Sequence, residues 1–73
     1  MNTTEAFRRF PAAYTQGFNA RVAYADRIRR GEVQDGDDMP PEPYKEPEWP
    51  TNCYPNECHA YRIGWANAID AEG

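Results

Sequence analysis

The segment from residue 31 to residue 52, GEVQDGDDMPPEPYKEPEWPTN, limits the possible folds of this chain more than any other feature. It holds five of the seven prolines and seven of the twelve acidic residues. Proline has no amide hydrogen, and its ring disrupts a helix interior or a central strand. Residues 31–52 are therefore predicted to form a long acidic connection, hereafter the connection, with regular structure only before and after it.

The residues before the connection show helical periodicity. Apolar and small residues recur at intervals of three and four between Tyr14 and Ile28, which is typical of an amphipathic helix. Pro11 suits the first turn of such a helix, and Gly31 can take the left-handed conformation that ends one. We expect a main helix over residues 11–30 and a short helix before Pro11.

A second main helix is predicted over residues 55–71. One of its faces carries the apolar and small residues Cys58, Tyr61, Gly64, Trp65, Ala68 and Ile69. Its start is placed near Asn52 to Pro55, with Asn52 as the candidate cap. The chain is therefore predicted to be a single all-α domain, residues 1–73, in which two main helices pack together.

A glycine in the middle of each main helix predicts where the two helices cross. Glycine is less favourable than alanine in a helix interior by about 1 kcal/mol. Gly17 and Gly64 therefore indicate that the two backbones approach closely. We expect Phe18, Tyr61 and Trp65 to form the centre of the core, with Gly64 at the crossing.

Charge is unevenly divided along the chain. Residues 1–31 carry six arginines and two acids, a net charge of +4, whereas residues 32–73 carry ten acids and two basic residues, a net charge of −8. The two halves either neutralise each other within the fold or leave one charge exposed to a partner. A basic-face hypothesis takes the contacts from Arg21, Arg27, Arg29 and Arg30. An acidic-loop hypothesis takes them from Asp35, Asp37, Asp38, Tyr44 and Trp49.

The two aromatic residues of the connection argue against its being wholly disordered. Tyr44 and Trp49 lie among prolines, in a segment that favours extended backbone. Their rings can bury a large apolar area against the helices. We therefore expect residues 44–50 to pack back over the core.

Several short motifs stand out along the chain. They are the turn Cys53-Tyr54-Pro55, then Tyr61, Gly64-Trp65 and Ala68, preceded by Gly17-Phe18 and Ala20-Arg21. Together they resemble the motifs of the ribosome modulation factor family. The resemblance is strongest in residues 53–68. It implies a fold of two helices and contacts between arginines and rRNA phosphates. Ribosome-binding members of that family are short and strongly basic, whereas this chain has a net charge of −4.

From the resemblance we expect a small regulatory binding protein that associates with the ribosome. The alternative is an acidic inhibitor, of the type encoded by phages or mobile elements, that binds a host regulatory protein and blocks its nucleic-acid-binding surface. Carboxylates of the connection would then attract a basic protein surface. Whether two copies form a homodimer is left open.

The sequence provides little for catalysis or metal binding. Cys53, Cys58 and His59 could ligate zinc, but structural zinc takes four ligands and no fourth candidate stands out. His59 has no nucleophile at a catalytic spacing. The run QDGDD lacks the glycine and glutamate that a calcium loop requires. We expect free thiols, no metal, no cofactor, no small-molecule substrate and no enzymatic activity.

No apolar run reaches the roughly 20 residues that cross a bilayer. The N-terminus also lacks the charged and then apolar pattern of a secretory signal. We therefore expect a soluble, cytoplasmic protein with no membrane partner.

Overall fold

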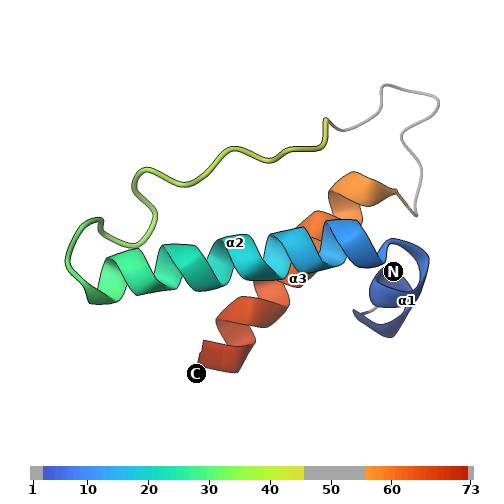
Figure 1. Cartoon of the computed structure of the whole chain (residues 1–73), viewed down its shortest axis with the longest axis horizontal. Coiled ribbons are helices and arrows are strands. Elements are labelled where there is room, and N and C mark those ends of the chain that lie inside the picture. The colour runs from blue at the N-terminus through green and yellow to red at the C-terminus, as the bar shows by residue number, and fades with distance from the viewer. Residues whose placement is uncertain (1–2, 46–55, 73) are drawn as a thin grey trace.

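The computed structural model describes residues 3–45 and 56–72 (Figure 1). These residues form three helices: α1 at Thr3–Arg9, α2 at Pro11–Arg29 and α3 at Glu57–Glu72. Helix α3 crosses α2, and α1 packs against both at the N-terminal end of α2. The described ranges contain no strand, so the all-α prediction is confirmed. Within those ranges, no helix is long and apolar enough to span a membrane.

Helices α1 and α2 join at a proline, as predicted. The Phe10 amide donates to the Ala6 carbonyl at 2.9 Å, and the Tyr14 amide donates to the Phe10 carbonyl at 3.0 Å. Pro11 lies in the first turn of α2, where a missing amide hydrogen costs no bond within the helix. The short helix before Pro11 and the main helix after it are both confirmed.

Gly31 ends α2, as predicted. Its φ is +78°, and its amide donates to the Ile28 carbonyl at 3.0 Å. The Glu32 amide donates to the Arg27 carbonyl, also at 3.0 Å. These two bonds form a Schellman motif. After this turn, residues 32–45 run back along α2 toward its N-terminal end (Figure 1).

Helix α3 begins slightly later than predicted. Its first residue is Glu57, and the His59 amide donates to the side-chain Oδ1 of Asn56 at 2.9 Å. Asn56, not Asn52, therefore caps the helix and satisfies one of its first amides. Asn56 directly precedes Glu57, whereas the predicted cap lies four residues earlier in the sequence. Asn52 lies outside the described residues.

The two long helices cross at their glycines. A Cβ atom on Gly64 would collide with the Tyr14 carbonyl oxygen and would lie 3.0 Å from the Phe18 amide nitrogen. A Cβ atom on Gly17 would collide with the Tyr61 carbonyl oxygen. Backbone therefore packs on backbone at this point, and the predicted crossing is confirmed.

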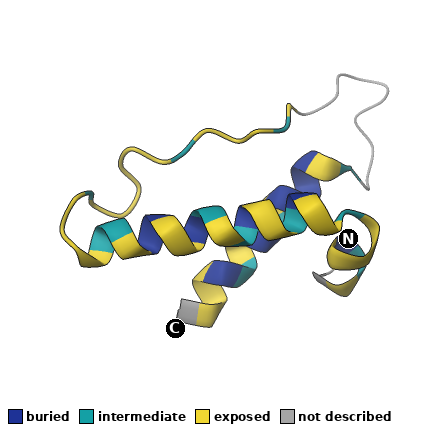
Figure 2. Ribbon diagram, viewed as in Figure 1, coloured by how far each residue is buried: buried dark blue, intermediate teal, exposed yellow. Residues whose placement is uncertain are grey.

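The composition of the core is only partly as predicted. Tyr61 is buried, but Phe18 and Trp65 are only half-buried. Figure 2 shows how buried and exposed positions alternate along the helices. Among the described residues, Tyr24 is the largest fully buried side chain. The other buried apolar residues are small: Ala6, Ala13, Ala25, Cys58, Ala60 and Ala68. Since the backbones touch at the glycines, large rings do not fit between the helices and lie beside the crossing.

Replacing Gly64 by alanine should destabilise the fold. Alanine has the higher helix propensity, so any loss of stability must come from the collision with the α2 backbone. We expect a loss of about 1–3 kcal/mol, measured by urea denaturation followed by circular dichroism. Ala66→Gly, at an exposed position of α3, is the control for propensity alone. A Gly64→Ala variant as stable as the parent would contradict the backbone contact.

Candidate binding surface

The connection folds over the predicted basic face of α2. Asp35 Oδ1 lies 3.5 Å from Arg21 Nη1, and Asp38 Oδ2 lies 3.0 Å from Arg27 Nη2. Both aspartates come from the turn-rich stretch that follows Gly31. The acidic and basic halves of the chain therefore neutralise each other in part, which was one of the two outcomes that the charge pattern allowed.

The last two arginines of the basic-face set are also paired with carboxylates. Arg29 lies 3.7 Å from Asp26. Arg30 lies 3.3 Å from Asp26 and 2.8 Å from Glu32. All four arginines of the basic-face hypothesis thus lie close together along α2 and its end, and each has a carboxylate partner within the chain.

The acidic-loop residues are brought together less completely. One turn of the connection holds Asp35, Asp37 and Asp38. Asp35 and Asp38 form ion pairs, whereas Asp37 forms none with the described residues. Tyr44 is half-buried against the core, with its ring centroid 6.3 Å from that of Tyr61, so the predicted packing is confirmed there. Trp49 and the rest of 46–50 lie outside the described residues.

Tyr24 holds the turn of the connection against α2. Its hydroxyl donates to the Asp37 carbonyl at 2.5 Å, with the Gln34 carbonyl at 3.0 Å as a second acceptor. The same hydroxyl accepts a hydrogen bond from the Gly36 amide at 3.0 Å. The sequence prediction missed this residue, although Tyr24 continues the spacing of three and four from Gly17. A buried tyrosine hydroxyl needs a partner, and here a turn of backbone provides it.

Arg21 is buried within this surface and helps to hold it together. It is 7% exposed, and its guanidinium carbon lies 5.5 Å from the Tyr24 ring centroid and 5.8 Å from that of Trp65. Such stacking stabilises a cation that burial would otherwise penalise. Asp35, its ion-pair partner, has a side chain that is 74% exposed. Arg21 is therefore much less accessible to an external phosphate than the basic-face hypothesis requires.

Truncating Arg21 should cost more stability than truncating its acidic partner. Arg21→Ala removes the contacts with two rings and the packing of the aliphatic stem, and should destabilise by about 2 kcal/mol. Asp35→Ala removes one solvent-screened ion pair and should cost less than about 1 kcal/mol. Arg29→Ala, at an exposed position, is the control. Equal, small shifts in the thermal midpoint for all three variants would disprove the structural role of Arg21.

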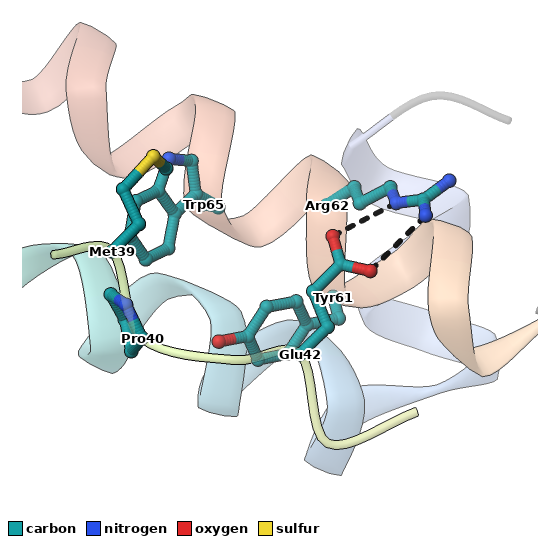
Figure 3. Close-up of a pocket in the computed structure, with 6 residues that line it drawn as sticks. All are labelled: Met39, Pro40, Glu42, Tyr61, Arg62 and Trp65. Carbon is teal, nitrogen blue, oxygen red and sulfur yellow. Dashed lines mark hydrogen bonds and ion pairs between the residues drawn. The ribbon is translucent and has the colours of Figure 1, made fainter. Parts of the chain in front are cut away.

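A small cavity lies between the connection and α3 (Figure 3). Its volume is about 200 Å³. The residues that line it are Met39, Pro40 and Glu42 of the connection and Tyr61, Arg62 and Trp65 of α3. The two groups face each other across the cavity, which therefore exists only because the connection packs on α3.

A bidentate ion pair between Arg62 and Glu42 lies at one edge of this cavity (Figure 3). Arg62 Nε donates to Glu42 Oε1 at 3.0 Å, and Arg62 Nη2 donates to Glu42 Oε2 at 3.1 Å. Parallel bonds of this type fix geometry as well as adding energy. The pair holds the proline-containing part of the connection against α3.

Tyr61 contributes a polar group to the cavity. The residue is 4% exposed, but its hydroxyl is not among the buried polar atoms that lack a hydrogen bond. Burial, and to a lesser degree the nearby Glu42 carboxylate, raise the pKa of Tyr61 above its usual value. The hydroxyl therefore remains protonated at neutral pH and is available as a donor.

The described residues offer no metal centre. Within 3–45 and 56–72, no three side chains of the histidine, cysteine, aspartate and glutamate types are placed to hold an ion. Cys58 is a buried free thiol whose sulfur lies 3.9 Å from Glu42 Oε2. Its predicted role as a small core residue is confirmed. Cys53, the other candidate ligand, is outside the described residues.

Comparison of the chain with models of known families, with curated proteins and with solved structures finds no match. The resemblance to the ribosome modulation factor family therefore stays a prediction based on sequence motifs.

Proposed function

We propose that this chain is a small, non-enzymatic regulatory protein that binds a partner protein through a basic surface of that partner. The observation that supports this proposal most directly is the set of ion pairs between the connection and α2. These pairs engage three of the four arginines that an RNA-binding function would need, namely Arg21, Arg27 and Arg30. The chain as a whole has a net charge of −4.

The arginines of α2 are poorly placed to compete for phosphate. A phosphate that approached Arg27 would have to displace Asp38, and one that approached Arg30 would have to displace Glu32. A carboxylate on the same chain acts at a high effective concentration. The remaining negative charge would also repel a polyanion.

The carboxylates, in contrast, can still contact a partner. The side chains of Asp35 and Asp38 are 74% and 73% exposed although both are paired. A carboxylate has about four acceptor positions, so one ion pair does not use its whole capacity. Asp37 is exposed next to them, and among the described residues it has no ion pair.

The ribosome-associated function remains the alternative, on the basis of the sequence resemblance. It requires the connection to leave α2 so that the arginines can contact rRNA. Arg29 and Arg30, with side chains 65% and 59% exposed, would be the first residues available.

Two triple variants distinguish these functions. One replaces Asp35, Asp37 and Asp38 by asparagine, and the other replaces Arg27, Arg29 and Arg30 by glutamine. Binding of each folded variant to a lysine-rich peptide and to purified ribosomes is measured across a salt series. Three lost contacts of about 0.5 kcal/mol each should weaken peptide binding by the aspartate variant roughly tenfold and flatten its salt dependence.

The arginine variant should bind the peptide as well as the parent or better, because its carboxylates are released. Replacing the exposed acids Glu57 and Asp70, which lie on α3, is the control for net charge alone. If the parent instead binds ribosomes, and the arginine variant alone loses that binding, the proposal is wrong and the ribosome-associated alternative is supported.

A further inference from the structure

We propose that the cavity between the connection and α3 binds one aliphatic side chain from a segment of the partner protein that is rich in lysine or arginine. This inference rests on the proposed function, and it gives that function a defined contact site.

The size of the cavity suits a side chain. Sites for drug-sized molecules occupy about 300–1,000 Å³, whereas this cavity has a volume of about 200 Å³. Protein interfaces commonly depend on a few side chains that enter pockets of their partner. Met39, Pro40 and the Trp65 ring provide apolar walls (Figure 3), so the group that enters should be aliphatic.

Tyr61 adds a specific polar contact. Its hydroxyl projects from α3 into the cavity, on the side of Pro40 (Figure 3). The residue is 4% exposed as a whole, but its hydroxyl is not among the buried polar atoms that lack a hydrogen bond, so water can reach it at the cavity. A bound group that displaces this water must supply an acceptor in its place. A backbone carbonyl of the bound segment would satisfy this donor, which favours a peptide over a hydrocarbon.

The walls of the cavity are held in place before any partner binds. Pro40, Pro41 and Pro43 restrict the backbone of the connection, and the ion pair of Glu42 with Arg62 ties it to α3. Little conformational entropy is therefore lost on binding. Met39, which is 52% exposed, is the flexible member that can adapt to the entering side chain.

The negative charge around the cavity favours a basic partner segment as the source of the aliphatic side chain. Glu42 lies at the edge of the cavity, and Asp37 and Asp38 precede it on the same connection. Glu42 accepts two bonds from Arg62 and one from the Cys58 thiol. A carboxylate has about four acceptor positions, so one remains for a flanking ammonium or guanidinium group. A second copy of this chain would bring its own net charge of −4 and is disfavoured as the occupant.

The test uses the full chain and two synthetic peptides. Both peptides consist of lysines around one central residue, which is leucine in the first and alanine in the second. Binding is followed by NMR through the Met39 methyl and the Trp65 indole signals. We expect both signals to shift with the leucine peptide, and the leucine peptide to bind roughly tenfold more tightly.

Two variants test the site without disturbing the core. Met39→Ala, at a half-exposed position, should remove most of the preference for leucine. Tyr61→Phe keeps the ring and should weaken binding of the leucine peptide several-fold through loss of the hydroxyl. Val22→Ala, an exposed apolar position on α2 outside the cavity, should change neither affinity.

The outcomes separate this inference from the proposed function. Equal affinity for the two peptides, with salt dependence retained, overturns the cavity proposal but leaves an acidic binding surface. No binding of either peptide overturns both. Self-association of the chain that Met39→Ala abolishes would assign the cavity to a second copy and would also overturn the proposal.

Discussion

The direct contact between the backbones of α2 and α3 is the constraint on which the rest of the structure depends. Gly17 and Gly64 have no side chains to separate the two helices, and each lies against a carbonyl of the other helix. Apart from Tyr61, the buried apolar residues near the crossing are small. Large aromatic rings are displaced to the sides of the helix pair, where Trp65 is only half-buried. A chain with a thin alanine-rich core thus has aromatic surface available for other contacts.

That aromatic surface is what the connection packs against. Tyr24 bonds the backbone of the turn after α2, Arg21 stacks on Tyr24 and Trp65, and Tyr44 packs on Tyr61. The ion pairs of the connection are individually weak because most of them are exposed. They fix the position of a segment that the aromatic contacts already hold. The position of residues 32–45 of this acidic segment therefore follows from the glycine crossing.

The packing of the connection on α2 brings the opposite charges of the two halves of the chain into contact. The acids of the connection neutralise the arginines of α2 and keep a chain that lacks a large core compact. The same packing creates the cavity beside Trp65, because Met39 and Pro40 come to face α3. In the proposed function, one segment therefore covers the arginines and supplies both the carboxylates and one wall of the contact site.

Local signals in the sequence were sufficient to predict the helices and the point at which the two long helices cross. Pro11 and Gly31 set the limits of α2 through backbone chemistry that acts within a few residues, and mid-helix glycines have few explanations other than close packing. The identity of the most buried ring, the ion-pair partners and the cavity depended on the tertiary structure. Many of these contacts join residues ten or more positions apart, such as Tyr24 with Gln34 and Arg62 with Glu42. Periodicity carries no information about which acid meets which arginine, because that is decided by the path of the connection.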